Sequence, residues 1–321
     1  MQAPKFWDKK ESKIAKILAP FGVLYAYFVA HRLAHHHPYQ AKMPVICIGN
    51  ISVGGTGKTP VCLALAKLLS SHQLSPWFLN HGYHAAEQSV IVDTKVHSAL
   101  DVGDEALLLA NFAPTIVDSA RARGAQLAEK HNAPLLIMDD GFQNPSLVKT
   151  FSFIVIDGTK GFGNERVLPA GPLREPPLKG LKRADAIILV GKDVWGVQQY
   201  LKENKVDLPV FTGQFVPDKN TLQPGKPVCA FAGIGNPQKF FDMLTLMGVQ
   251  LVKTQSFPDH YFYTRFDIED LKKKAQGAQL ATTSKDWVKI PPEMRTGLIQ
   301  ISGHFEFDQP DEVWHLLKES L

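Results

Sequence analysis

The stretch SVGGTGKTP, residues 52–60, lies between two apolar segments and is the strongest indication of the fold. Before it, Pro44 to Ile48 form a short run containing Val and Ile, which is typical of a buried strand. After it, residues 61–69 carry apolar side chains at helical spacing. Glycines between a strand and a helix allow backbone N–H groups to face an anion, and the helix start adds a partial positive charge. We therefore predict a nucleotide-binding P-loop, rather than a plain glycine turn before a surface helix.

The residues of this loop have expected roles in binding ATP and Mg²⁺. Lys58 can reach the β- and γ-phosphates, and the Thr59 hydroxyl can bind Mg²⁺. The usual pattern has Gly where this chain has Ser52, and the extra pair of glycines resembles the loop of dimer-forming P-loop ATPases. Those ATPases carry Lys where this chain has Val53, so their second-lysine mechanism is not supported. The expected nucleotide contacts are Ser52, Val53, Gly54, Gly55, Thr56, Gly57, Lys58 and Thr59.

The positive charge of the chain is concentrated at its N-terminal end. The 321 residues have a formal net charge of +4. Residues 1–42 hold seven Lys or Arg and two acidic residues, whereas the remainder holds 28 basic and 29 acidic residues. Because no basic patch follows residue 42, we expect no nucleic-acid partner. The three cysteines lack metal-ligand spacing and are consistent with a reducing compartment.

The same basic end contains an uncharged run from Ile17 to Ala30. Its larger apolar residues fall on one helical face, but the run is shorter than the roughly 20 residues of a spanning helix. Lysines before an apolar face favour a helix that lies in a membrane interface. The alternative is a first helix packed on the protein's own core. The residues expected on the apolar face are Ile14, Ile17, Leu18, Phe21, Leu24, Tyr25 and Phe28.

Acidic residues are expected to complete the nucleotide site. Residues 135–138 form an apolar strand that ends in Asp139 and Asp140, and ligands bind at the carboxyl edge of such sheets. Two adjacent acids repel each other unless a cation is near, which favours a metal site over a simple Asp-Gly turn. Asp104, in DVGDEALLLA, could be a helix N-cap or a catalytic base.

The C-terminal third predicts a second α/β unit. VCAFAGIGNPQKFF at residues 228–241 indicates a strand, a glycine turn and a helix, and QPGKP at residues 223–227 suits a linker. We therefore expect three parts: residues 1–42, a P-loop kinase domain at 43–220, and a smaller α/β domain at 221–321. His260 lies beside Asp259 in SFPDHYFYT, where it could be a partly buried ring or an oriented imidazole.

As a set, these motifs resemble the tetraacyldisaccharide 4'-kinase family of lipid A biosynthesis. The matching stretches include GNISVGGTGKTP, VGDEALLLA, DDGFQ, LPAGPLREP, FPDHYFY and TTSKDWVK, in the order of the family. The resemblance implies a P-loop NTPase-like core that transfers the γ-phosphate of ATP to the 4'-hydroxyl of a tetraacyl disaccharide 1-phosphate. It also implies a location on the cytoplasmic face of the bacterial inner membrane.

The resemblance implies roles for particular residues. It implies that Asp104 is the base, with His260 as its partner. Lys58 and Arg174 would contact phosphates, and Asp139 and Asp140 would lie near the metal. The remaining implied roles are Mg²⁺ linkage for Thr59 and Glu175, and active-site polar contacts for Tyr83 and Gln143.

A non-kinase P-loop ATPase that acts as a switch is the competing interpretation. It predicts a second signature Lys or metal-binding clusters of Cys and His. HRLAHHH, at residues 31–37, is the one His cluster in the sequence, and no acidic residue or Cys joins it. We interpret it as part of the interface-facing end of the first helix.

Overall fold

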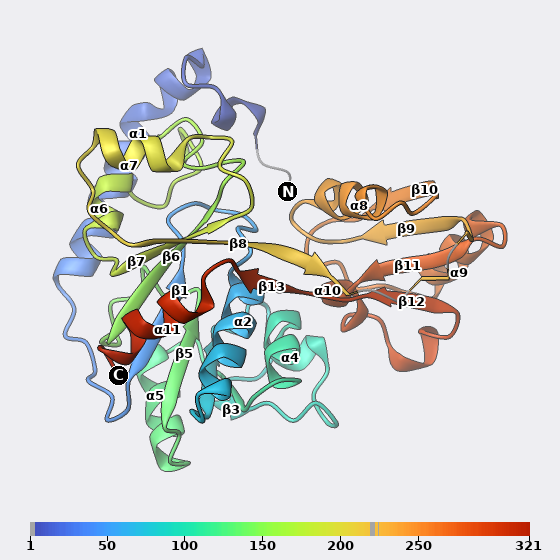
Figure 1. Ribbon diagram of the computed structural model, residues 1–321, viewed down its shortest axis with the longest axis horizontal. Coiled ribbons are helices and arrows are strands. Elements are labelled where there is room, and N and C mark those ends of the chain that lie inside the picture. The colour runs from blue at the N-terminus through green and yellow to red at the C-terminus, as the bar shows by residue number, and fades with distance from the viewer. Residues whose placement is uncertain (1–3, 219–221, 224) are drawn as a thin grey trace.

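The computed structural model describes residues 4–218, 222–223 and 225–321. Two sheets organise the chain, one of nine strands and one of four (Figure 1). The larger sheet has the order β13-β8-β7-β6-β1-β5-β2-β4-β3. Its strands are β1 (Val45–Gly49), β2 (Pro76–Asn80), β3 (Val90–Ile91), β4 (Thr115–Val117), β5 (Leu135–Asp139), β6 (Phe151–Asp157), β7 (Ala186–Val190), β8 (Val210–Pro217) and β13 (Gly303–Phe307).

The larger sheet is parallel except at its two edges. β3 and β13 are the antiparallel edge strands, and β1 lies in the middle between β5 and β6. Helices separate most of the strands, which confirms the α/β prediction. They are α1 (Lys13–Ala34), α2 (Lys58–Ser71), α3 (Ala99–Val102), α4 (Asp104–Ala110), α5 (Arg121–Lys130), α6 (Pro177–Leu181), α7 (Val197–Glu203) and α11 (Pro310–Lys318), with a 3₁₀ turn at Lys5–Asp8.

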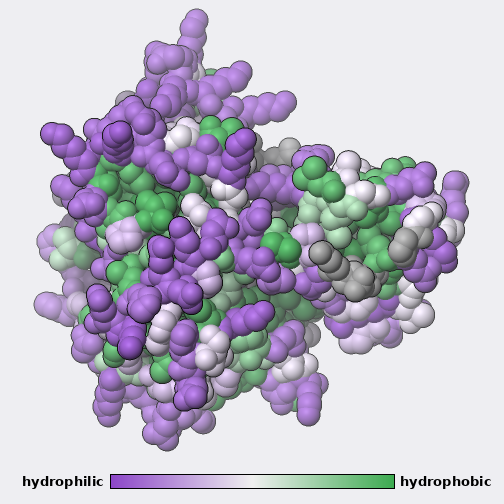
Figure 2. Space-filling model, in the orientation of Figure 1, coloured by the Kyte–Doolittle hydropathy of each residue, from purple (hydrophilic) through white to green (hydrophobic). Residues whose placement is uncertain are grey.

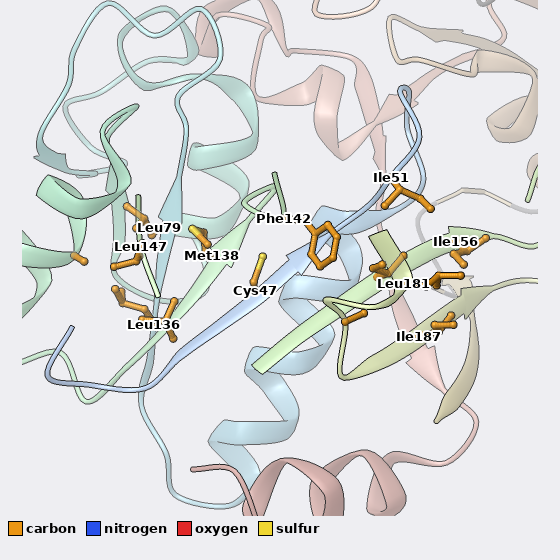
Figure 3. Packing of buried hydrophobic residues seen from close by; sticks show 14 of the residues in the cluster. Cys47, Ile51, Leu79, Leu136, Met138, Phe142, Leu147, Ile156, Leu181 and Ile187 are labelled. Atoms are coloured by element: carbon orange, nitrogen blue, oxygen red, sulfur yellow. The ribbon is translucent and has the colours of Figure 1, made fainter. Parts of the chain in front are cut away.

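The two faces of the larger sheet pack against different helices because successive strand side chains point to opposite faces. In β1, Val45 and Cys47 belong to one apolar cluster, whereas Ile46 and Ile48 belong to the other. The first cluster includes residues of α5, α6 and α7, and Figure 3 shows Phe142 in it between Cys47 and Leu181. The second includes residues of α2, α4 and α11. The P-loop strand is therefore held from both sides.

The smaller sheet is entirely parallel, with the order β10-β9-β11-β12. Its strands are β9 (Val228–Ala232), β10 (Leu251–Ser256), β11 (Gln279–Thr283) and β12 (Leu298–Ile301). The helices of this unit are α8 (Pro237–Leu246), α9 (Arg265–Ala275) and α10 (Ser284–Trp287), with a 3₁₀ turn at Pro292–Met294. It forms the lobe at the right of Figures 1 and 2, and hydrophilic side chains cover most of the visible face of the larger body in Figure 2.

The second unit ends before residue 321, where we expected its C-terminal boundary. β12 ends at Ile301, and the chain then returns to the larger sheet, where β13 pairs with β8. Phe305 of β13 packs in the cluster that includes Phe211, so burial of this aromatic side chain fixes the strand there. The smaller sheet is therefore an insertion between β8 and β13. The expected boundary between residues 220 and 221, and part of the expected linker at 223–227, lie outside the described residues.

The first helix, α1, contacts the body through small residues. Ala15, Gly22 and Val29 are buried at seven-residue spacing, and a Cβ at Gly22 would lie 2.8 Å from the carbonyl oxygen of Val167. The large apolar side chains point outward. Those exposed by at least half are Ile14, Ile17, Phe21, Val23, Leu24, Tyr27 and Phe28. Residues 13–34 are long and apolar enough to cross a membrane, and 17% of the most apolar window is buried in the protein.

Candidate active site

The P-loop lies at the carboxyl end of β1 and opens α2, as the sequence predicts. Gly57 precedes the helix with a φ of 91°, in the left-handed region that favours glycine. Lys58 is the first residue of the helix. A Cβ at Gly54 or Gly55 would meet no atom within 4 Å. There is therefore open space beside Gly54 and Gly55 on the side where a side chain would lie.

The first residues of the loop are anchored inside the protein. The N–H of Val53 donates to the carbonyl oxygen of Pro172 at 2.8 Å, and Ser52 pairs with Leu173 in an isolated bridge. The Val53 N–H is thus already bonded within the protein, and the expected nucleotide contact of this residue stays a prediction. Thr56, farther along, accepts a hydrogen bond from the amide of Asn50 at 3.0 Å.

Asp140 joins the two cations expected at the phosphates. Arg174 donates to both of its carboxylate oxygens, at 2.9 and 3.1 Å, and the Lys58 ammonium lies 3.6 Å away. Burial raises the pKa of Asp140, but the charge of Lys58 and then that of Arg174 outweigh it, so the pKa is lowered. The structure therefore brings Lys58, Asp140 and Arg174 together around one carboxylate.

Asp139 ends β5 and is almost completely buried. Its Oδ2 accepts from the Thr59 hydroxyl at 3.1 Å, whereas its Oδ1 has no hydrogen-bond partner. Burial, followed by repulsion from Glu105, raises the pKa of Asp139 to about 7. The side-chain oxygen of Asn50 is likewise buried and unpaired. Hard oxygen donors are what Mg²⁺ prefers, so the hydrogen-bonded pair of Asp139 and Thr59 fits this ion.

Glu175 and Gln143 are buried in a network behind the P-loop. Arg183 donates to both Glu175 oxygens, at 2.5 and 2.7 Å, and Gln143 donates to one of them at 2.9 Å. Gln143 also donates to the Asn50 carbonyl and accepts from Arg174. Both side chains therefore have protein partners in this structure. Metal linkage by Glu175 and a substrate contact by Gln143 stay predictions.

Asp104 and His260 meet although they are 156 residues apart in the chain. Asp104 follows Gly103 at the start of α4 and is 4% exposed. Nδ1 of His260 lies 3.0 and 3.1 Å from its two carboxylate oxygens. The exposed ring of Tyr83 is 5.3 Å from the imidazole, centre to centre. Three residues that the sequence placed in separate motifs therefore share one site.

Two lysines of the second unit also face Asp104. Lys285 and Lys289 lie 3.9 and 4.0 Å from its Oδ2. Burial raises the pKa of Asp104, but the hydrogen bond with His260 and the charge of Lys285 outweigh it and lower the pKa to about 2. The carboxylate is therefore ionised at neutral pH.

The second unit also lies against the P-loop. A Cβ at Gly235 would be 3.3 Å from the Asp259 carboxylate and 3.7 Å from the backbone nitrogen of Gly55. The smaller unit is therefore docked on the larger one. Its glycine turn at Gly235 lies against the P-loop, and its His260 contacts Asp104. One site is formed from the carboxyl edge of the larger sheet and the facing loops of the smaller one.

Sequence reasoning missed several residues of this site. Lys285 and Lys289 in TTSKDWVK are four residues apart, a spacing that places two side chains on one face of a helix. Nothing in the local sequence shows that this face is turned to Asp104. Arg121 is fully buried and donates to the backbone oxygen of Asp139 at 2.8 Å. A buried arginine cannot be recognised from its helical neighbours.

No group of three or more His, Cys, Asp or Glu side chains arranged to hold a metal occurs among the described residues, the histidines of 31–37 included.

The chain is similar to one family in its sequence and in its fold. Residues 14–321 match the model of the LpxK family, described as tetraacyldisaccharide-1-P 4'-kinase. Tetraacyldisaccharide 4'-kinases from Paramagnetospirillum magneticum and Rhodospirillum rubrum are 44% and 43% identical over 97% of this chain, and the aligned regions cover 96% and 95% of those proteins. A crystal structure of LpxK from Aquifex aeolicus in complex with ATP has a TM-score of 0.77 and 27% identity, and the match covers 96% of this chain and 99% of that one.

Proposed function

The chain belongs to the tetraacyldisaccharide-1-phosphate 4'-kinase family, and we propose that it transfers the γ-phosphate of ATP to the 4'-hydroxyl of a tetraacyldisaccharide 1-phosphate. This reaction belongs to lipid A biosynthesis. The observation that carries the proposal is that the smaller unit lies against the P-loop at Gly55 and also contacts Asp104 through His260. A phosphate site and an oriented carboxylate on facing surfaces are what transfer to a sugar hydroxyl needs.

The phosphate half of the site neutralises and orients ATP. Little covalent work falls to the protein in phosphoryl transfer, so placement and charge dominate catalysis. Lys58, which directly follows the P-loop glycines, and Arg174 both contact Asp140 and supply the positive charge for the phosphates. Asp139 and Thr59 would hold Mg²⁺, which neutralises charge on the phosphate oxygens when bound. The P-loop N–H groups bind the remaining phosphate oxygens.

The base half accepts the proton of the sugar hydroxyl. As the 4'-oxygen forms its bond to the γ-phosphorus, the bond from that phosphorus to the bridging oxygen of ADP breaks. The hydroxyl proton passes to the Asp104 carboxylate. His260 holds both Asp104 oxygens through Nδ1, so it orients the carboxylate and stabilises its charge. Asp104 is therefore the base and His260 its positioning partner.

Incubation with γ-labelled ATP and a tetraacyldisaccharide 1-phosphate in detergent tests the function directly. Label must appear in the lipid, with ADP formed in equal amount. Hydrolysis of ATP that leaves the lipid unlabelled would instead indicate a P-loop switch and would reject the kinase proposal.

We further propose that the protein acts at the cytoplasmic face of the bacterial inner membrane, where the lipid substrate would be reached. α1 turns its large apolar side chains outward, and Lys13 and Lys16 precede them. An apolar face with adjacent lysines binds the interface of an anionic membrane. Phe21 and Phe28 are each about 60% exposed on α1 and offer a direct test.

Flotation with vesicles containing anionic lipid measures this contact. Phe21→Glu with Phe28→Glu should lower the vesicle-bound fraction at least tenfold. Two aromatic side chains that would insert into the membrane are lost, and two negative charges are added. Phe266→Glu on α9 is the matched control, since Phe266 is also exposed but lies on the second unit. Equal flotation of the α1 variant and the wild type would place the membrane contact elsewhere.

A further inference from the structure

We infer that Lys285 is a positioning residue, which couples docking of the smaller sheet to the placement of Asp104. The inference rests on the proposed role of Asp104 as the base. Lys285 lies in α10, on the smaller sheet, and its ammonium faces three carboxylates.

The carboxylates around Lys285 belong to both sides of the docked interface. Its Nζ is 3.1 Å from Oε1 of Glu105, where it donates a hydrogen bond, and 3.9 Å from Oδ2 of Asp104. Both residues are on α4, beside the larger sheet. On its own side, Nζ is 3.9 Å from Asp259, the neighbour of His260. A single ammonium therefore ties the base to the loop that carries its histidine.

The charges around Asp104 show what Lys285 does there. Three carboxylates, those of Asp104, Glu105 and Asp259, are concentrated at the interface. The facing cations are Lys285, Lys289 and, when protonated, His260. Lys289 is engaged elsewhere, because it bonds to Asp286 at 2.9 Å and to the Gly233 carbonyl at 2.8 Å. Loss of Lys285 would leave like charges opposed across the interface, which favours undocking.

A second ion pair across the interface provides an internal control. Lys239 of α8 pairs with Asp157 at the end of β6. It links the same two sheets, but neither residue is paired with Asp104 or Glu105 among the described contacts. If Lys285 served only to hold the lobes together, removal of Lys239 should have the same consequences. If it positions the base, only the Lys285 variant should change the pH dependence of catalysis.

The experiment compares Lys285→Met, Lys285→Arg and Lys239→Met in the full chain. Label transfer from γ-labelled ATP to the tetraacyldisaccharide 1-phosphate is measured as kcat and KM from pH 2 to pH 9, a range that includes the acid limb expected from Asp104. Lys285→Met should lower kcat roughly 10²-fold, with little change in the KM for ATP, since misplacement of a reacting group costs rates of this order. Lys285→Arg should recover most of the loss, because the charge is kept.

The pH profile separates positioning from structure. Lys285 lowers the pKa of Asp104, so its removal raises that pKa and the acid limb of kcat should move to higher pH by about one unit. Lys239→Met should leave the acid limb where it is. An unshifted limb in Lys285→Met, or the same rate loss in Lys239→Met, would overturn the proposal.

Amide hydrogen exchange gives a readout that does not depend on turnover. In Lys285→Met, exchange should rise in α4 and in residues 259–263, while α2 and α5 stay protected. If the wild type transfers no label, the proposed function fails. The exchange measurement still tests whether Lys285 links α4 to the loop that carries His260. Exchange in α4 that matches the wild type would reject the role of Lys285, and Lys285→Arg checks that any change reflects charge rather than misfolding.

Discussion

The phosphate half and the base half of the site are built in different ways. The phosphate half lies within one sheet, where β1 and β5 are neighbours and Ile48 pairs directly with Asp139. The base half joins α4 to loops of the smaller sheet through side chains, with His260 and Lys285 as the links. Backbone ladders therefore fix the phosphate contacts, whereas the base is complete only when the lobes are docked. Binding of ATP and catalysis should be separable by mutation.

Lys58→Ala should have the largest effect, on the half that is already formed. Turnover should fall roughly 10³–10⁵-fold, the range by which a single cation at the transferred phosphoryl group changes the rate. Asp140 keeps both hydrogen bonds from Arg174 in this variant, so the thermal transition should stay close to that of the wild type. Label transfer and a thermal melt measure the two quantities. Comparable turnover in the variant would remove Lys58 from the site.

Asp104→Ala should leave the phosphate half intact. Loss of a general base costs about 10²–10⁴ in rate, so kcat should fall by that order. Nucleotide affinity, measured by titration calorimetry, should be nearly unchanged because Asp104 lies outside the P-loop. A parallel loss of ATP affinity would show that the two halves are not independent.

His260→Ala should have a smaller effect, roughly 10-fold to 10²-fold on kcat, because the histidine orients the base rather than replacing it. Residues that act as a unit are not additive, so the double variant with Asp104→Ala should be little slower than Asp104→Ala alone. A kinetic double-mutant cycle decides the point. If the two losses multiply, His260 contacts the substrate independently of Asp104.

The smallest expected effect is a pH dependence of stability. Asp104 has a folded-state pKa of about 2 and an ordinary value of 3.8, so the unfolded chain binds more protons between these values. Its contribution is present above pH 3.8 and is lost as the pH falls toward 2. The stability advantage of the wild type over Asp104→Asn should therefore shrink by about 2 kcal/mol from pH 6 to pH 2. Urea unfolding of both proteins measures this change, and a constant difference across the range would contradict the lowered pKa.

The difference between the two halves also explains what the sequence could predict. The P-loop and the acidic strand end are local patterns, so strand, turn, helix and Asp139 follow from residues close together in the chain. Lys285 carries no comparable local pattern, and its role depends on a contact 180 residues away. Asp104 and His260 could be paired in advance only through resemblance to the family. The return of β13 was missed because Gly303–Phe307 gives an ordinary strand pattern that does not indicate which sheet it joins.

The insertion of the smaller sheet has a consequence for how the protein can be recombined. The two ends of the insertion meet, since Gly303 pairs with Pro217 and the N–H of Asp218 donates to the Ser302 carbonyl at 3.0 Å. Closely spaced ends allow a segment to be exchanged without disturbing its host. Residues 218–302 therefore form a cassette that relatives could swap as a single genetic block. A chimera made this way would take its ATP-binding half from one parent and the partners of its base from the other.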